Sequence, residues 1–383
     1  MKKIIITTYH FYPEINPRAF RAFELAKSLA KNNCEVEIVI PDIDYNFIDI
    51  EEKYGFKINK IKPGFLLNSS IKTIDYHKEN NHKKSLFFKL GKFLLSGIYL
   101  GGKSFEYAFT LYSYLKNMNK NFDAIISISF PISVHIGTSL YLRRLKKNVV
   151  SIADTGDPFS NNPESKNYFY FKLIERNIFK YFDYITIPID SAKKAYEGLV
   201  DEKKLKVIPQ SIDFSEIRIK NYKSNDVVTF GFAGIFYEKI RNPKVLFDFL
   251  ATLKMDFRFI LYTDTTSPLN MKLIDKYRDI LKEKLVINSL ITREKCIYEL
   301  SGMDFVINQN NINAEQKTSK LIDYMITGRP IFEFTQDSFD GNEFLKFLKE
   351  PNKNIDKIKN MYIKELVKYD AKNVTNSFLG LIK

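Results

Sequence analysis

The chain has few of the residues that mark metal-binding or disulfide-rich proteins. Its 383 residues include two cysteines, Cys34 and Cys296, and four histidines. Neither cysteine stands at metal-ligand spacing from a histidine, so a structural metal site is not expected. The low cysteine content fits a reducing compartment such as the cytoplasm.

Long hydrophobic runs are also missing from the sequence. No window approaches the roughly 18 consecutive apolar residues of a membrane-spanning helix. The first residues, MKKIIITTYHFYP, are too few for the apolar region of a signal peptide and contain no small-residue cleavage site. We therefore expect a cytoplasmic protein, and a peripheral contact with the inner face of the membrane stays open.

Apolar and basic residues are abundant. Hydrophobic residues make up 45% of the chain and aromatic residues 15%, which is enough to form two cores at a length typical of two domains. The formal net charge of +14 suits a surface that attracts phosphate, nucleic acid or acidic lipid. Lysine is frequent throughout, so the charge alone identifies no partner. No segment resembles a nucleic-acid-binding module, and no nucleic-acid partner is expected.

The first half alternates segments with strand and helix patterns. After the first strand, Asn16 as N-cap and Pro17 at the first helical position predict the start of a helix. This alternation is typical of a parallel sheet with helices between its strands. Strands are expected at Ile4–Thr7, Val36–Ile40, Ala124–Ser129, Asn148–Ile152, Tyr184–Ile187 and Lys206–Ile208.

The pattern restarts after the polar stretch Asn221–Val227. As in the first half, an Asn-Pro pair (Asn242 and Pro243) begins the helix after the first strand. A basic residue lies beside each pair, Arg18 in the first half and Arg241 in the second. Strands are expected at Val227–Phe232, Phe257–Tyr262, Leu285–Ile287, Phe305–Ile307 and Ile331–Phe334.

The predicted fold class is therefore α/β, with two Rossmann-like, doubly wound parallel-sheet domains. We expect the first domain at residues 1–215, the second at 216–352, and closing helices at 353–383. The segment 42–122 is too long for a simple connection within the first domain. Its basic and aromatic residues fit ordinary amphipathic helices, and they also fit a surface that contacts a membrane or an apolar substrate.

One stretch matches a nucleotide-binding motif letter for letter. Gly97–Ser104, GIYLGGKS, satisfies the phosphate-loop pattern G-x-x-x-x-G-K-S. A working phosphate loop follows a buried strand, whereas the preceding LFFKLGKFLL has the pattern of a helix. An ATP-binding protein that uses this loop is kept as the less favoured alternative.

Two loops of the second half are expected to bind a ligand, because ligands of open α/β sheets bind beyond the carboxyl ends of the strands. In the loop Gly234–Arg241, Gly234 permits close approach of the backbone, and Lys239 and Arg241 supply charge. The other loop leads into a helix with Lys320 in its first turn. A lysine there opposes the helix dipole by about 0.3–1 kcal/mol. A bound anion would be attracted by both the lysine and the positive end of the helix dipole, so Lys320 is predicted to bind a diphosphate.

Two carboxylates flank this lysine. Glu315 precedes the expected helix, Asp323 lies one turn into it, and Ser319 lies between them. Carboxylates accept hydrogen bonds from the paired hydroxyls of a sugar. Ligands for phosphate together with ligands for diols predict a nucleotide sugar. A surface ion pair between Lys320 and Asp323, at i,i+3 spacing, explains the same residues equally well.

Glu315, Asp323 and the turn TGRP at Thr327–Pro330 together resemble the signature of the retaining glycosyltransferases of family 4. That signature is a glutamate, a second acidic residue eight positions later, and a small-Gly-basic-Pro turn. The family has the GT-B fold, in which two Rossmann-like domains face a central cleft. The resemblance implies that Asp323 binds the donor ribose, that Glu315 lies near the donor sugar, and that Lys320 lies near the phosphates.

The first loop of the second domain departs from the family pattern. The usual Gly-Arg pair is Gly234-Ile235 here, and Arg241 falls where the phosphate-binding lysine is expected. Having Asp rather than Glu at position 323 is a milder departure. Both leave the base and the sugar of the donor undetermined.

The resemblance extends to the first domain, apart from residues 42–122. YPEINPRAFRAFELAKSLAKNNCEVEIV matches the family's opening strand, loop, helix and strand. His135 follows a strand, where such enzymes often carry a histidine near the transferred sugar. Asp154 and Asp157 follow another strand, and with Arg18 they are candidate acceptor-side residues. A hydrogen-bonded structural histidine and turn-forming aspartates remain alternatives.

The predicted function is transfer of a sugar from a nucleoside diphosphate sugar to a glycan, lipid-linked or other acceptor held by the first domain. His135 and Glu315 are the expected catalytic residues. The resemblance implies retention of configuration and a role in bacterial surface polysaccharide synthesis. No metal-ligand cluster is evident, so we expect metal-independent transfer without a cofactor. A sugar-nucleotide 2-epimerase of the same architecture is the main alternative.

Overall fold

The structure, a computed structural model, describes residues 1–14, 16–64, 103–145, 149–156, 158–161, 169–312 and 319–382. The chain forms two compact units. The first comprises Met1–Ile212 and Tyr369–Lys383, and the second comprises Asp213–Lys368. The closing segment expected at 353–383 is thus divided, because its last helix belongs to the first unit.

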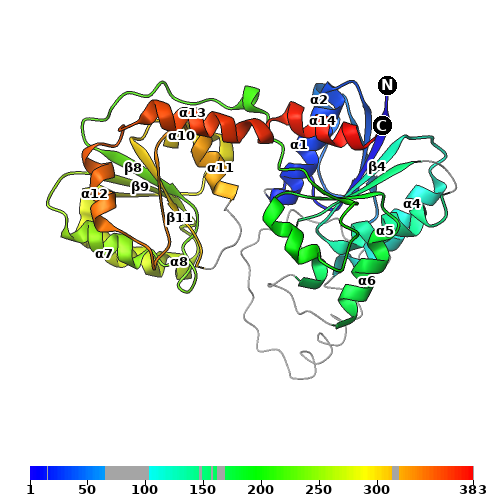
Figure 1. Cartoon of the computed structure of the whole chain (residues 1–383), viewed down its shortest axis with the longest axis horizontal. Helices are drawn as coiled ribbons and strands as arrows, with labels where there is room; N and C mark the ends of the chain where they lie inside the picture. Colours follow the sequence, from blue (N-terminus) through cyan, green and yellow to red (C-terminus); the bar gives the residue numbers. More distant parts are fainter. Residues whose placement is uncertain are drawn as a thin grey trace. The chain divides into compact units, whose positions relative to one another are not determined.

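The first unit contains a seven-stranded sheet in the order β3-β2-β1-β4-β5-β6-β7, and every neighbouring pair is parallel. Figure 1 shows β4 of this sheet with α1 and α14 on one side and α4 and α5 on the other. The order reverses between β1 and β4, which makes this a doubly wound sheet. Its strands are β1 (Lys3–Thr8), β2 (Glu35–Pro41), β3 (Lys57–Ile61), β4 (Ala124–Ile128), β5 (Val150–Asp154), β6 (Tyr184–Ile187) and β7 (Leu205–Val207).

Strand β3 was not predicted, and it lies inside the segment 42–122. Its sequence, KINKI, contains two lysines and an asparagine, and only Ile61 is buried. β3 is an edge strand that pairs only with β2 in the described sheet. Edge strands bury little side-chain surface and often carry lysine, so their hydrophobic pattern is weak.

Helices cover both faces of this sheet. Buried residues of α1 and α14 share one hydrophobic cluster with β1, β2 and β4, while α4 and α5 contribute to a cluster on the other face. The start of α1 is as predicted, because the Asn16 side chain accepts hydrogen bonds from the backbone N–H groups of Arg18 and Ala19. The helices are α1 (Pro17–Lys31), α2 (Ile48–Tyr54), α4 (Tyr107–Asn117), α5 (Ile132–Leu142), α6 (Phe169–Phe179) and α14 (Ala371–Leu381).

The second unit contains a five-stranded parallel sheet in the order β10-β9-β8-β11-β12. All five strands were predicted, with ends that differ by at most two residues. They are β8 (Thr229–Ala233), β9 (Arg258–Thr263), β10 (Leu285–Ser289), β11 (Phe305–Gln309) and β12 (Ile331–Phe334). The helices are α7 (Lys244–Thr252), α8 (Pro268–Ile274), α9 (Arg278–Leu281), α10 (Arg293–Ser301), α11 (Ser319–Ile326), α12 (Gly341–Lys349) and α13 (Ile355–Leu366).

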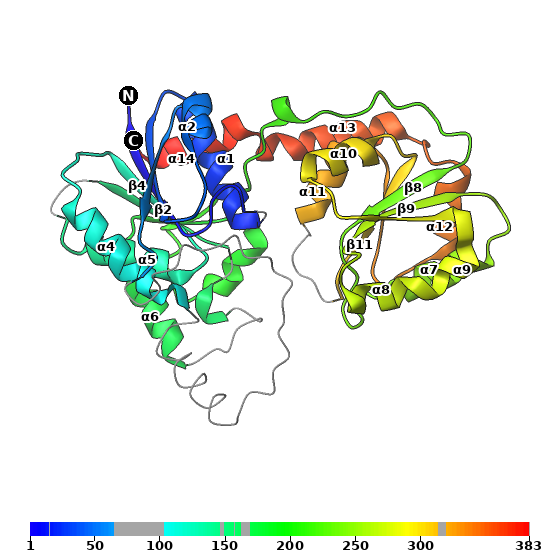
Figure 2. The ribbon, with the colours of Figure 1, turned by 180° about the vertical axis from the view of Figure 1, so that it is seen from behind.

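Alternating residues of these strands form two cores, and Figure 2 shows α7 and α8 on one face of the sheet and α10 and α11 on the other. On the first face, the ring of Phe230 stacks on those of Phe259 and Phe305, with centroids 4.8 Å away in both cases. Each such buried side chain contributes about 1.5–3 kcal/mol. On the other face, Gly231 permits close approach of α10, because an added Cβ would lie 2.6 Å from Cδ2 of Leu300 in that helix.

Candidate functional site

The order of the second sheet reverses between β8 and β11, and the predicted donor residues follow these two strands. Ligands of doubly wound sheets bind outside the carboxyl ends of the strands at such a switch point. The loop Gly234–Arg241 leaves β8, and the residues from Asn310 onward leave β11 toward α11. The topology therefore brings both predicted loops to one place.

Hydrogen bonds join the two loops. The backbone N–H of Ile312 donates to the carbonyl oxygen of Ile240 at 3.0 Å, and Arg241 Nε donates to Asn311 Oδ1 at 2.9 Å. The buried Tyr324 connects α11 to the end of β8, since its hydroxyl group is 3.0 Å from the nitrogen of Ala233 and 3.1 Å from its oxygen. Helix α11 is thereby held beside the end of β8.

Arg241 is a half-buried cation at this junction. Besides Asn311, its guanidinium contacts the carbonyl oxygen of Ile235, 3.5 Å from Nη1, and no carboxylate in the described ranges pairs with it. Burial lowers the pKa of Arg241 below its ordinary value. A positive charge held out of water without a negative partner favours the binding of an anion.

Asp323 is bound by a residue that the sequence analysis did not identify. Arg293, the first residue of α10, approaches Asp323 Oδ1 with both Nε at 2.8 Å and Nη2 at 2.7 Å. Lys320 Nζ lies 3.8 Å from Asp323 Oδ2, and its side chain is 39% exposed. The predicted i,i+3 ion pair is present but long. Asp323 is largely satisfied by Arg293, so the lysine remains available to a ligand.

The remaining donor-side candidates are placed to different degrees. Lys239 is exposed and has no partner within the described part of the chain. Gly234 lies beneath Arg241, because an added Cβ would lie 3.8 Å from Arg241 Nη1. Ser319 begins α11, but its side chain lies outside the described residues, as does Glu315.

Arg329, the basic residue of the TGRP turn, faces the opposite edge of the sheet. It precedes β12, and its guanidinium lies 3.8 Å from the ring centroid of Tyr222. It is 3% exposed, and burial lowers its pKa. This residue supports the start of the strand and is not part of the site.

In the first unit, His135 lies inside the protein. The side chain is 0% exposed, its Nδ1 is 2.8 Å from Ser127 Oγ, and its ring packs against those of Phe179 and Phe182. Burial lowers its pKa to about 3, so the ring is neutral at physiological pH. The ring thus packs within the first unit, and its Nε2 is buried without a hydrogen-bond partner among the described residues. The catalytic role predicted for His135 stays a prediction.

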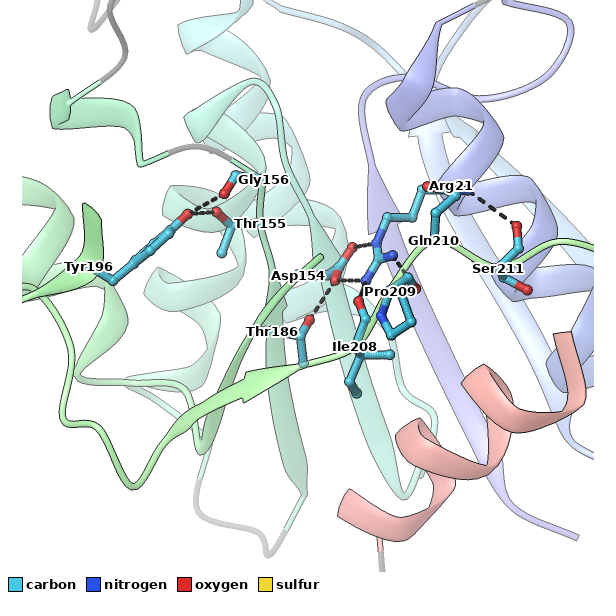
Figure 3. A network of polar contacts seen from close by, with 10 residues as sticks. All are labelled: Arg21, Asp154, Thr155, Gly156, Thr186, Tyr196, Ile208, Pro209, Gln210 and Ser211. Carbon is cyan, nitrogen blue, oxygen red and sulfur yellow. Dashed lines mark hydrogen bonds and ion pairs between the residues drawn. The ribbon is translucent and has the colours of Figure 1, made fainter. Parts of the chain in front are cut away.

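Asp154 also has a structural partner. Its carboxylate binds Nε and Nη2 of Arg21 and the hydroxyl group of Thr186 (Figure 3). Arg21 additionally donates to the carbonyl oxygens of Ile208 at 2.9 Å and Pro209 at 2.8 Å. This buried ion pair holds α1, β5, β6 and the chain leaving β7 together, so a turn-forming role does not describe Asp154.

The other first-unit candidates, Asp157 and Arg18, are less defined. Asp157 lies outside the described residues. The guanidinium of Arg18 occupies the space in which a Cβ at Gly156 would lie, at the carboxyl end of β5. Lys103 and Ser104 of the phosphate-loop match begin a short 3-10 turn at Lys103–Glu106, and Gly97–Gly102 lie outside the described residues.

Sequence reasoning missed Arg293 and Asn311, and no local pattern distinguishes them. Arg293 follows the N-cap Thr292 of an ordinary amphipathic helix. Asn311 stands in a polar loop where asparagine is common. Only the contact of each with Asp323 and Arg241, respectively, places it in the site.

Two further observations concern membranes and metals. No helix in the described ranges is long and apolar enough to cross a membrane. Among the residues the structure describes, no three His, Cys, Asp or Glu side chains are grouped as a metal ion would require.

Solved structures are similar to this chain along the length of both α/β units. A glycosyltransferase from Rickettsia africae aligns with 100% of this chain and 98% of its own, with a TM-score of 0.65 and 12% identity. HepE of Anabaena in complex with UDP aligns over 99% of both chains, with a TM-score of 0.66 and 10% identity. The lipopolysaccharide outer core galactosyltransferase WaaB aligns with 100% of this chain and 99% of its own, with a TM-score of 0.61 and 11% identity.

The chain therefore has the GT-B fold, as predicted. At these identities the likeness concerns the fold alone. The sequence matches no protein-family model and no curated protein.

Proposed function

We propose that the chain is a glycosyltransferase that binds the diphosphate of a nucleotide sugar at the β8–β11 switch point of the second unit and transfers the sugar to an acceptor held by the first unit. The observation that carries the proposal is Arg241, a half-buried guanidinium without a carboxylate partner in the described ranges. A diphosphate supplies the missing negative charge, and it is also the group on which charge develops when the sugar leaves.

Three positive groups supply the charge for this role. Arg241 is held by Asn311, Lys320 is half-exposed in the first turn of α11, and Lys239 is exposed on the loop from β8. The N–H groups in the first turn of α11, which have no partner within the helix itself, add to their attraction for an anion. Stabilising the leaving diphosphate lowers the barrier without a metal ion, so we propose metal-independent transfer.

We propose the donor contacts that the resemblance to family 4 implies, with one addition, the pairing of Asp323 with Arg293. Asp323 would accept hydrogen bonds from the ribose while it also pairs with Arg293, whose two contacts fix the carboxylate. Glu315 is proposed to lie near the donor sugar, and retention of configuration follows from the same resemblance. HepE is described in complexes with UDP and with UDP-glucose, which makes uridine the first base to test.

The acceptor is proposed to be a glycan or a lipid-linked glycan. One structural relative, TarM of Staphylococcus aureus, is described in complex with UDP, fondaparinux and a GlcNAc-glycerol. A peripheral location on the inner face of the membrane would suit a lipid-linked acceptor and the basic character of the chain.

Calorimetric titration with UDP, GDP, ADP and CMP tests the donor site. We expect saturable binding of one nucleoside diphosphate and a roughly 10- to 100-fold weaker affinity for Arg241→Ala, the loss of one or two charge-assisted hydrogen bonds. Lys320→Ala should weaken binding less, because its side chain is more exposed. A screen of UDP sugars with glycoside acceptors, read by mass spectrometry, then identifies the transferred sugar.

Arg258→Ala is the matched control. This arginine begins β9 and is exposed at the opposite edge of the same sheet. It should leave the affinity unchanged. Equal affinities for the wild type and Arg241→Ala would contradict the assignment of the site. Release of an altered free donor, with no transfer product, would favour an epimerase.

A further inference from the structure

Two residues at the end of β11 and just after it hold the loop that carries Arg241. The side chain of Gln309, which is 1% exposed, donates from Nε2 to the carbonyl oxygen of Asn242 at 2.8 Å. Asn311 Oδ1 accepts a hydrogen bond from Arg241 Nε at 2.9 Å. The end of the strand therefore holds the side chain of Arg241 as well as the backbone of the residue that follows it.

The backbone of Arg241 is also fixed within its own loop. Its N–H donates to the carbonyl oxygen of Tyr237, and its carbonyl oxygen accepts from the N–H of Tyr237, both at 3.1 Å. The N–H of Asn242 donates to Gln336 Oε1 at 3.0 Å. A cation on a segment that is already ordered loses little freedom when a ligand binds, and this favours tight binding.

The contact with Asn311 determines which edge of the Arg241 guanidinium is free. A guanidinium has five N–H donors in a fixed planar arrangement. Nε is used by Asn311, and Nη1 makes only a long contact with the carbonyl oxygen of Ile235, at 3.5 Å. The described part of the chain supplies no acceptor for Nη2. The edge formed by Nη1 and Nη2 is thus left for a ligand, and two parallel N–H groups match two oxygen atoms of a phosphate.

The side chain at position 311 is neutral, and this preserves the charge of Arg241. An amide oxygen accepts the Nε proton without cancelling the positive charge, whereas a carboxylate in the same place would form an ion pair. Arg241 is half-buried and has no carboxylate partner in the described ranges. Asn311 therefore orients the cation and leaves its charge available to an anion.

We propose that Asn311 is a positioning residue of the donor site. It directs the Nη1 and Nη2 edge of Arg241 toward the diphosphate of the nucleotide sugar, and it does so without neutralising the charge that attracts the diphosphate. The inference rests on the proposed function and deepens it. It concerns the second unit alone, and it assigns to Asn311 a role that acts through Arg241.

Replacement of Asn311 by aspartate separates this role from a structural one. Asn311→Asp keeps the shape and the acceptor atom, and a carboxylate binds a guanidinium more strongly than an amide does. A merely structural contact would therefore be kept or improved, and the urea midpoint should not fall. We expect calorimetry with UDP, or with GDP, ADP or CMP if the wild type binds that nucleotide instead, to give a Kd at least about 10-fold higher, because the new carboxylate neutralises Arg241 and repels the phosphates.

Two further variants test whether Asn311 acts through Arg241. Asn311→Ala removes the acceptor and should raise the Kd by about 3- to 10-fold, the effect of losing one orienting hydrogen bond. The same change added to Arg241→Ala should alter the Kd of that variant by less than about 2-fold, because the effects of residues that act as one unit do not add.

Asn360→Asp is the matched control for the added charge. Asn360 is exposed on α13, and the described contacts of Arg241 involve other elements. This change should leave the Kd as in the wild type. The inference is overturned if Asn311→Asp binds the nucleotide as tightly as the wild type does, or if Asn311→Ala weakens the Arg241→Ala variant by the same factor as the wild type. A wild-type chain that binds none of the four nucleotides would instead overturn the proposed function itself.

Discussion

Two histidines of the first unit follow strands and occupy opposite environments. His10 is partly exposed and bound by Glu14, whereas His135 is enclosed by Ser127 and two phenylalanine rings. The two environments differ because one histidine lies in a helix and the other in a loop. His135 lies within α5, on a face that packs into the domain, while His10 lies in the loop that leaves the sheet. For a lone histidine, exposure rather than position after a strand decides what chemistry is open to it.

The burial of His135 predicts a pH-dependent stability. Burial lowers its folded-state pKa to about 3, Asp154 opposes this shift and Arg18 adds to it. An unfolded histidine has a pKa of about 6.5. Between these values the unfolded chain binds more protons, so the free energy of unfolding falls as the pH is lowered. Between pH of about 6.5 and about 5, the titration of this residue should lower the free energy of unfolding by about 2 kcal/mol.

His135→Asn isolates this effect. Asparagine can still hydrogen bond with Ser127, but it does not titrate in this range. Urea unfolding at several pH values should give a flatter dependence for the variant than for the wild type, whatever their absolute stabilities. Parallel curves below pH of about 6.5 would show that His135 is not the source.

Helix α11 is the element on which the donor site depends. Its inward face packs Leu321 and Met325 against Tyr362 of α13, and Tyr324 bonds to the end of β8. Its outward face presents Lys320, and Asp323 at its edge contacts α10. The apolar contacts of the inward face hold the helix in place. Lys320 is therefore not needed for packing and can face a ligand.

The pair of Asp323 and Arg293 should stabilise this element. The Asp323 side chain is 12% exposed and that of Arg293 is 28% exposed, so water can replace the contact only in part. Asp323→Asn keeps the shape and removes the charge. We expect a loss of about 1–3 kcal/mol in urea unfolding.

An exposed ion pair provides the comparison. Glu365→Gln removes the partner of Lys368 at the end of α13, where both side chains are more than a third exposed. Its effect should stay below about 1 kcal/mol. If the two variants have equal stabilities, the Asp323–Arg293 contact does not hold α10 and α11 together.

At the scale of the whole molecule, the two units are interleaved along the chain. The chain leaves the first unit after Ile212 and returns at Tyr369. These two points are bonded to each other, since the Ile212 N–H donates to the Tyr369 carbonyl oxygen at 2.9 Å and the Ala371 N–H donates to the Ile212 carbonyl oxygen at 3.0 Å. Helix α14 then completes the face of the first sheet that α1 begins.

This connectivity predicts that a substitution near the C-terminus destabilises the first unit. Phe378 of α14 is 1% exposed and lies in the same cluster as α1 and β1. Phe378→Ala should cost about 3–5 kcal/mol. Hydrogen exchange should show lost protection in residues 1–212 and 369–382 and unchanged protection in residues 213–368.

Ile363→Ala is the control for that variant. Ile363 lies on α13 and is 60% exposed, so the change should stay within about 0.5 kcal/mol. Loss of protection in the second unit of Phe378→Ala would mean that α14 stabilises both units.

Much of the fold could be predicted from the sequence. Buried parallel strands are short apolar runs, and caps such as Asn16 mark helix starts through local hydrogen bonds, so predicting them needs no knowledge of distant residues. The donor loops could be predicted for the same reason, because topology alone brings the loops after β8 and β11 together. The edge strand β3 was missed since its burial is slight.

The sequence by itself determined the two doubly wound sheets, the loops that meet at their switch points, and the presence of Lys320 and Arg241 in those loops. Only the tertiary structure decided which polar residues already have partners: Asp154 is bound by Arg21, Asp323 is bound by Arg293, and His135 is buried. Local patterns arise from contacts between residues close in sequence. Pairing and burial of charged groups depend on contacts between residues 30 to more than 130 positions apart, and no local pattern encodes them.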